Sequence, residues 1–565
     1  MLSHKVLTRQ DVNRAASYYE DGADDYYAGE GEASAWQGRG AELLGLEGAV
    51  DGERLRELLA GHVGSRASSR ISTRQDAQTR IGIDLTFSAP KSVSLQALVG
   101  GDARLVEAHD RAVAHTLALA EERAQARKKV NGQSQVEDTK NLVIAKFRHE
   151  TSRERDPQLH THALVLNLTR RSDGEWRALR NDEIVKATKY LGAVYRSELA
   201  SELQRLGYSL RYERGGMFEL AHMKRGQLAA FSQRAAQIER RLAAEGLTAE
   251  TATVAQKQRV KLATRPAKVS TDRAALFAEW RERARDVEID FARRDGLLET
   301  GRGEANATPS AVAAAEGARR SVRFAIAHLA ERQAIISERE LYDVALKHAV
   351  GSATVADVRR ELQRLATSGY LVPEQPLYRS ADGPANAPGM SREGWVRGHI
   401  ARGEDRNVAR QRVEADIASG RLVLAERRYT TQTALERERC ILAVEREGRE
   451  KVPPIASPEN VHVRLGLTRL NEGQRAAVEL ITASPHRVIG IQGYAGTDKS
   501  HMLQEAKRVS EEHGYRVVAL APYASQVRAL RELGVEEKTL ASFLAAREKQ
   551  LGERTVLVVD EAGTV

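Results

Sequence analysis

The sequence is nearly free of cysteine, with Cys440 as the only one among 565 residues. A single thiol cannot form an intramolecular disulfide, and a zinc site built from several cysteines is excluded as well. Any metal ion bound by this chain would therefore be held by histidine and carboxylate side chains.

Long apolar runs are missing too. No stretch of about 18 apolar residues is present to cross a bilayer, and the opening MLSHKVLT lacks the apolar core of a signal peptide. Aromatic residues make up only 5% of the sequence. The hydrophobic content of 41% and the charged content of 29% are typical of soluble globular domains. We therefore expect a cytoplasmic protein with no membrane insertion.

What the chain has in excess is positive charge. Its net charge is +9 and its pI is near 9.4, with no long block of one sign. An excess of Lys and Arg favours a polyanionic partner, and nucleic acid is the commonest one. At roughly 150 residues per domain, the length indicates three or four domains.

Four segments differ in their residue patterns. Residues 1–295 mix strand-like and helix-like stretches, and residues 296–320 are small and polar, as in a linker. Residues 321–450 are mainly helical in pattern. Residues 451–565 alternate strands and helices, which predicts a parallel α/β arrangement.

Within the first segment, short β-rich apolar runs predict strands at Gly82–Phe87, Leu142–Phe147 and Ala163–Leu168. The Ala-, Arg- and Glu-rich stretch Leu105–Lys129 has a helical period.

Two amphipathic stretches in the third segment, Ile336–Val350 and Thr354–Ser368, are followed by the strand-like Gly369–Val372. This order fits a winged-helix module or an ordinary helical spacer. In the last segment, strands are predicted at Val488–Ile491 and at two later stretches, Arg516–Leu520 and Thr555–Val559.

Three histidines form the most informative pattern. His160 and His162 are two residues apart on an expected strand, so strand alternation places both imidazoles on one face. His149 ends the preceding expected strand, and the charged loop between can return the chain antiparallel. Three imidazoles on such a hairpin can bind one divalent ion, leave positions open for a substrate, and let the ion polarise a phosphodiester oxygen.

An acidic residue, Asp84, interrupts the apolar strand IGIDLTF. A carboxylate in such a strand is costly unless it is paired. Because a metal-bound histidine usually needs an acceptor for its second nitrogen, Asp84 is a candidate for that role.

Two tyrosine pairs lie near the N-terminus: Tyr18 with Tyr19, and Tyr26 with Tyr27. A tyrosine hydroxyl has a pKa near 10 and attacks a phosphodiester only when a base or a metal activates it. The product is a phosphotyrosyl ester, which conserves the energy for resealing. Two nucleophiles would permit two successive cleavages.

Together these features resemble the MobF-type conjugative relaxases, the TrwC/TraI family within the HUH endonuclease class. The resemblance covers residues 1 to about 295, including the opening MLS, both tyrosine pairs, Asp84 with the following FSAPKS, and PQLHTH with His149 before it. It implies an α+β fold, a palm-like antiparallel sheet with helices. The residue patterns after it predict a winged-helix-like region and then an incomplete RecA-like P-loop lobe.

The resemblance also implies roles. The histidine triad would bind Mg²⁺, with Mn²⁺ or Zn²⁺ as alternatives, and Asp84 would orient a histidine or take the tyrosine proton. Tyr18 would make the first nick at the origin of transfer and become linked to the 5′ end, Tyr26 would perform the second strand transfer, and Tyr19 and Tyr27 would be spares. Candidates for phosphate contacts are Arg80, Lys91, Arg148 and Arg153.

The partners implied by the resemblance are single-stranded DNA with an adjoining hairpin, an accessory relaxosome DNA-binding protein, and a type IV coupling protein with its secretion channel. The relaxase would act in the donor cytoplasm and be carried, covalently bound to the strand, into the recipient.

The last segment resembles the start of a helicase motor. NEGQ looks like an adenine-reading motif and GYAGTDKS like a P-loop, but Asp498 stands where the pattern GxxxxGK[ST] has its second glycine. The nucleotide-site candidates are Gln474, Gly493, Gly496, Lys499, Ser500, Asp560 and Glu561. The Asp498 side chain adds bulk to the P-loop and places a negative charge beside the negatively charged phosphates. The stretch TVLVVDEA at Thr555–Ala562 looks like a Walker B strand, and the sequence ends shortly after it. We therefore expect ATP binding to be doubtful and helicase activity to be absent.

Three other functions share part of this pattern. A rolling-circle initiator or transposase of the same class usually has two histidines followed by the tyrosine, whereas here the tyrosines come first. A non-catalytic DNA-binding protein would have lost catalytic residues, and a hydrolytic metallonuclease would leave no protein–DNA adduct.

Overall fold

The structure is a computed structural model, and it describes residues 1–9, 34–63, 78–130, 133–152, 154–248, 251–253, 256, 259–260, 273–292, 310–383, 387–493, 499–531, 536–549 and 551–562. These residues fall into two compact units. The first comprises Met1–Leu329 with Ile335–Tyr429, and the second Ala330–Ala334 with Thr430–Val565. In the described ranges, no helix has the length and apolar character needed to span a membrane.

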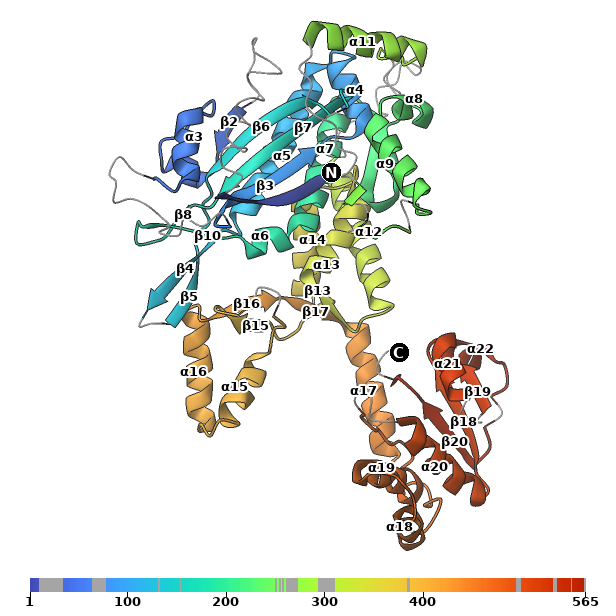
Figure 1. The fold of residues 1–565 in the computed structure, drawn as a ribbon. Helices are drawn as coiled ribbons and strands as arrows, with labels where there is room; N and C mark the ends of the chain where they lie inside the picture. Colours follow the sequence, from blue (N-terminus) through green and yellow to red (C-terminus); the bar gives the residue numbers. More distant parts are fainter. Residues whose placement is uncertain are drawn as a thin grey trace. The chain divides into compact units, whose positions relative to one another are not determined.

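A five-stranded antiparallel sheet forms the centre of the first unit, in the order β1-β3-β7-β6-β2 (Figure 1). Its strands are β1 (Leu2–Thr8), β2 (Ser34–Gln37), β3 (Arg80–Ser88), β6 (Ile144–Thr151) and β7 (Pro157–Leu166). The three strands predicted from β-rich runs are therefore confirmed, with shifted ends. The central strands are apolar almost throughout because helices cover both faces of the sheet.

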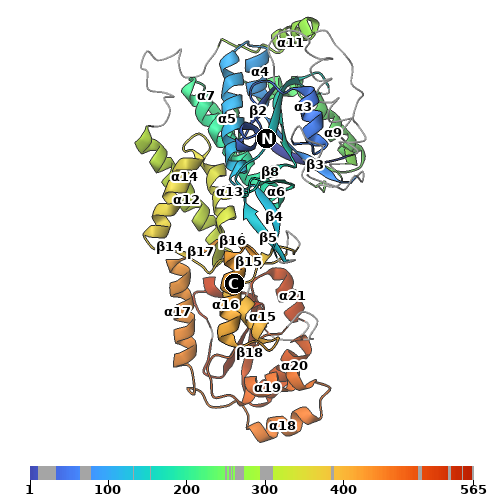
Figure 2. The same ribbon diagram turned by 90° about the vertical axis from the view of Figure 1, so that its left-hand side faces the viewer.

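Helices α5 (Ala103–Glu121) and α7 (Thr188–Arg205) lie together on one side of the sheet, and α3 (Gly52–Leu59) lies on the other (Figure 2). Alternate residues of β7 pack against the helices on opposite faces of the sheet. Ala163 and Val165 pack into the core beneath α5, whereas Leu164 and Leu166 pack with Leu55 and Leu58 of α3. The expected α+β fold with an antiparallel sheet is thus confirmed.

The predicted helix Leu105–Lys129 is wrong in its last part. Helix α5 ends at Glu121, and Gln125–Val130 forms strand β4, paired antiparallel with β5 (Gln133–Asp138) and with β10 (Leu179–Arg180). Helix propensity is a weak preference. It yields here to two strand partners, one of them far away in the sequence.

Smaller elements complete this part of the unit. They are α2 (Arg39–Glu42), α4 (Lys91–Leu98), β8 (Thr169–Arg170), β9 (Trp176–Arg177), α6 (Asp182–Lys186), β11 (Leu210–Glu213), β12 (Met217–Leu220), α8 (Arg225–Ala230), α9 (Gln233–Ala244) and α11 (Arg273–Asp286).

The predicted helix–helix–strand order of residues 336–372 is confirmed. Its elements are β13 (Ile335–Ser337), α13 (Glu338–Ala349), α14 (Val355–Thr367) and β14 (Leu371–Pro373). Strand β17 (Arg428–Thr431) lies between β13 and β14 in a three-stranded sheet, which gives the element order of a winged helix. Residues 311–320, expected in a linker, belong to helix α12 (Ala311–Ala330).

Between β14 and β17 the chain inserts a small module. It consists of β15 (Leu377–Ser380), α15 (Arg392–Ile400), α16 (Arg406–Ala418) and β16 (Leu422–Glu426). The β5 strand meets it where the Val136 amide donates to the carbonyl of Gly420 at 2.9 Å.

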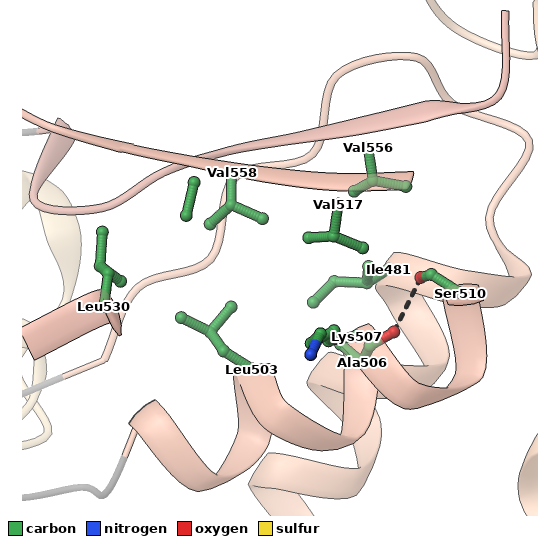
Figure 3. Close-up of a pocket in the computed structure, with 10 residues that line it drawn as sticks. Ile481, Leu503, Ala506, Lys507, Ser510, Val517, Leu530, Val556 and Val558 are labelled. Carbon is green, nitrogen blue, oxygen red and sulfur yellow. Dashed lines mark hydrogen bonds between the residues drawn. The ribbon is translucent and has the colours of Figure 1, made fainter. Parts of the chain in front are cut away.

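The second unit has a three-stranded parallel sheet in the order β19-β18-β20. Its elements are α17 (Gln432–Glu447), α18 (Pro458–Gly466), α19 (Glu472–Ala483), α20 (Lys499–Glu512), β18 (Arg516–Ala521), α21 (Ala524–Arg531), β19 (Glu536–Thr539), α22 (Leu540–Ala545) and β20 (Thr555–Val559). Figure 3 shows apolar side chains of α20 and α19 facing Val517, Val556 and Val558 of this sheet.

The strand predicted at Val488–Ile491 is wrong, because these residues have no regular structure. Among the described residues, the sheet of this unit consists of β19, β18 and β20. The other two strands predicted for this segment are confirmed as β18 and β20.

Candidate active site

The antiparallel register of β6 and β7 brings the three predicted histidines together. His149 is directly opposite His160, and Phe147 is opposite His162. All three imidazoles therefore lie on the same face of the sheet. Their ring centroids are 5.3 Å apart for His149–His160, 5.3 Å for His149–His162 and 5.2 Å for His160–His162.

Two of the rings have their Nδ1 atoms fixed by acceptors. His160 Nδ1 is 2.9 Å from the carbonyl oxygen of Gln158, and His162 Nδ1 is 2.8 Å from Asp84 Oδ2. A carbonyl oxygen or an ionised carboxylate can only accept a hydrogen bond, so each Nδ1 carries the proton in the neutral ring. The Nε2 atom then keeps the lone pair that a metal ion requires.

Asp84 comes from the neighbouring strand β3 and is buried, with 7% of its surface exposed. The β3–β7 register places Thr86 opposite His162, and Asp84 is two residues further along. The buried carboxylate is thus paired, as its position in an apolar strand requires.

Burial lowers the pKa of His160 to about 4, and the electrostatic interaction with His162 is the next contribution. At neutral pH the ring is uncharged, which is the form that ligates a metal.

These residues fit a divalent ion. With metal–nitrogen bonds of about 2.0–2.1 Å, two imidazoles on one ion have centroids roughly 5 Å apart, close to the separations seen here. The fit lies in the spacing of the rings and in the type of donor atom. Within the described ranges, no three His, Cys, Asp or Glu side chains are already arranged to coordinate one metal ion.

The opposite face of β7 holds a buried polar network that the sequence did not reveal. Thr161, between the two histidines, is 2.8 Å from His109 Nε2, and His109 Nδ1 is 2.8 Å from the Tyr195 hydroxyl. Burial lowers the pKa of His109, so this ring is neutral. The network is spread over three elements, and no local sequence signal marks it.

Of the four cations proposed for phosphate contacts, Arg153 lies outside the described residues and the other three have partners within the protein. Arg80 donates to Asn181, to Leu179 and, at 3.0 Å, to Asn167 Oδ1. Arg148 pairs with Asp110, and Lys91 Nζ donates to the carbonyl of Pro157 at 2.9 Å.

Tyr18, Tyr19, Tyr26 and Tyr27 lie outside the described residues, as do Gly496 and Asp498.

The described nucleotide-site candidates have local partners in the second unit. Lys499 Nζ is 3.5 Å from Glu561 Oε1 and 3.3 Å from the carbonyl of Gly493. Gln474 closes a capping box with Asn471 at the start of α19. Ser500 lies in the first turn of α20, and Asp560 directly follows β20.

The five-stranded antiparallel sheet carries His-x-His on its middle strand and the third histidine on the adjacent strand, as expected from the resemblance to the HUH endonuclease class. Comparison with known proteins narrows the class. The TrwC relaxase family model matches residues 12–287, and an AAA domain model matches residues 469–565. A solved copper-bound conjugative relaxase TrwC in complex with oriT DNA is 64% identical, and the likeness covers 52% of this chain and 100% of that one, with a TM-score of 0.50.

The chain belongs to the TrwC relaxase family. The multifunctional conjugation protein TraI of Escherichia coli is 36% identical over 346 residues, which are 59% of this chain and 19% of TraI. This chain therefore matches about a fifth of that relative's length. TrwC has also been solved with a 27-mer DNA that comprises the recognition hairpin and the cleavage site, and that chain is 60% identical, with a TM-score of 0.47.

Proposed function

We propose that residues 1–295 nick one DNA strand at an origin of transfer by tyrosine transesterification. The observation that carries this proposal is the convergence of His149, His160 and His162 on one face of the sheet, with Asp84 bonded to His162. Membership in the TrwC relaxase family supports it.

In the first step, the Tyr18 oxygen attacks the scissile phosphorus and loses its proton. The bond between phosphorus and the 3′ oxygen breaks, the 3′ oxygen takes up a proton, and the 5′ phosphate remains esterified to Tyr18. One phosphoester replaces another, so no ATP is consumed. We propose Tyr26 as the nucleophile of a second transfer, with Tyr19 and Tyr27 as spares.

The triad would hold a divalent ion, for which Mg²⁺, Mn²⁺ and Zn²⁺ are candidates. When bound, the ion would polarise the scissile phosphate and offset the charge that develops on it. Asp84 keeps the proton of His162 on Nδ1 and thereby directs Nε2 toward the ion. It is also the candidate acceptor for the tyrosine proton.

The substrate we propose is single-stranded origin DNA with an adjacent hairpin, and the solved complex of TrwC with oriT DNA supports an origin substrate. An accessory relaxosome protein, a type IV coupling protein and delivery into a recipient cell complete the proposal.

The test is a denaturing gel of the protein with an oligonucleotide carrying the cognate origin, in Mg²⁺. We expect a covalent protein–DNA band that is absent with Tyr18→Phe or with EDTA. Cleavage without an adduct would indicate a hydrolytic nuclease, and binding without cleavage a non-catalytic DNA-binding protein.

We also propose that this chain hydrolyses ATP weakly or not at all, because Asp498 stands at a P-loop position where bare backbone normally approaches the phosphates. We expect Asp498→Gly to strengthen binding of a fluorescent ATP analogue. A strong DNA-stimulated ATPase in the unaltered chain would contradict this.

A further inference from the structure

The loop that joins β6 to β7 lies directly beside the histidine triad, and its backbone is strained. Arg155 has a φ of 59°, in the left-handed region that a residue with a side chain rarely adopts. The Ser152 amide donates to the carbonyl of Asp156 at 2.9 Å, which closes the turn. Such a conformation persists only when its surroundings hold it.

Helix α11, more than a hundred residues later in the sequence, provides that support. The Trp280 indole nitrogen donates to the carbonyl of Arg155 at 2.7 Å, while the Trp280 ring is completely buried in the main core. One turn further along, Arg283 Nη2 is 2.8 Å from Asp156 Oδ1.

Asp156 is the centre of this anchor, with 1% of its surface exposed. Its second carboxylate oxygen accepts the Gln233 backbone amide, in the first turn of α9, at 2.8 Å. Arg283 is fixed in turn by a 2.7 Å bond to the carbonyl of Ala230 and by the Phe231 ring, 4.5 Å from its guanidinium.

The same helix also contacts the other strand of the hairpin. Arg273, in the first turn of α11, is 3.0 Å from Glu150, the residue that follows His149. The β6–β7 ladder is irregular between His149 and Thr151, so strand pairing alone does not fix this end of the hairpin.

We infer that helix α11 sets the spacing between His149 and His160 by holding the β6–β7 loop in place. Asp156 is the positioning residue through which the helix acts. This inference rests on the proposed metal-binding role of the triad and extends it to residues that contact neither metal nor DNA. Without the anchor, the loop would relax from its left-handed turn, and His149 would move relative to its partner strand.

The test compares Asp156→Asn with Glu202→Gln in the full chain. The control breaks another buried acid's pair, Glu202 with Arg111 at 2.9 Å, which joins α5 and α7 away from the triad. Mn²⁺ affinity is measured by isothermal titration calorimetry, and hydrogen exchange is followed over residues 149–162.

We expect Asp156→Asn to weaken Mn²⁺ binding about 10-fold or more, as outer residues of metal sites do, and to speed exchange in the hairpin. Arg283→Lys, which keeps a charged donor, should retain part of the affinity. Glu202→Gln should lower the melting temperature with Mn²⁺ affinity and hairpin exchange unchanged.

Unchanged Mn²⁺ affinity and unchanged hairpin exchange in a folded Asp156→Asn variant would overturn the inference. If the unaltered protein bound no Mn²⁺ while Asp156→Asn still loosened the hairpin, the metal-binding proposal would fail and the anchor would stand.

Discussion

The orientation of His162 depends on one buried carboxylate, that of Asp84. Asp84→Asn preserves the volume but removes the charge, and its amide can present either a donor or an acceptor to Nδ1. We expect cleavage of the DNA strand to slow about 10- to 100-fold, while binding of the DNA hairpin is retained. Cleavage kinetics and an equilibrium DNA-binding assay measure the two effects separately.

Thr86→Val is the matched control for that change. The Thr86 hydroxyl is 3.3 Å from His162 Nδ1, a weaker contact than the 2.8 Å bond to Asp84. Its loss should alter cleavage much less, and equal defects in the two variants would refute a special role for the carboxylate.

Lys91 makes the folding stability of the protein depend on pH. Burial lowers the pKa of Lys91 from 10.5 to about 8. Between these values the unfolded chain binds more protons than the folded one, so this group favours folding increasingly as the pH rises. In urea titrations, the unaltered protein should therefore gain stability relative to Lys91→Met between pH 8 and 10.5. A constant difference between the two proteins would contradict the prediction.

At the level of single elements, the sequence predicts the strands of the central sheet better than the side-chain contacts that hold the sheet to the helices and loops around it. The β3, β6 and β7 strands and the face shared by His160 and His162 follow from local composition and from period-2 alternation. The His109–Tyr195 contact and the Asp156–Arg283 pair join residues 86 and 127 positions apart, and no local pattern records such contacts. For β4, one of its two partner strands, β10, is likewise distant in the sequence, whereas the other, β5, follows it directly.

The pairing of β3 with β7 requires a residue without a side chain at Gly82. A Cβ atom there would lie 2.6 Å from the carbonyl oxygen of Val165 on the partner strand. Gly82→Ala should therefore destabilise the protein by about 1–3 kcal/mol, as overpacking does. Gly226→Ala in helix α8 is the control, since nothing lies within 4 Å of its Cβ position. Thermal melts should show a loss for the first variant and no loss for the second.

At the scale of the whole molecule, the first unit joins the relaxase residues to the winged-helix-like region and its inserted module. The Ser197 hydroxyl donates to the carbonyl of Ala353 at 2.8 Å in a buried position. Arg379 of the module is 2% exposed, and its Nη2 atom is 2.9 Å from Glu183 Oε1 in helix α6. These contacts predict that Met1–Leu329 and Ile335–Tyr429 unfold together, apart from the second unit.

Calorimetry of the full chain should accordingly show two transitions, of which only one responds to Arg379→Met. Removing the buried pair leaves Glu183 with Lys186 alone, at 3.1 Å, so we expect a loss of about 1.5–3 kcal/mol in that transition. Glu414→Gln breaks the exposed pair with Arg392 inside the module and should change stability little, because exposed pairs contribute at most about 1 kcal/mol. If Arg379→Met instead split the first transition in two, the module would fold independently, and the relaxase domain would end before it.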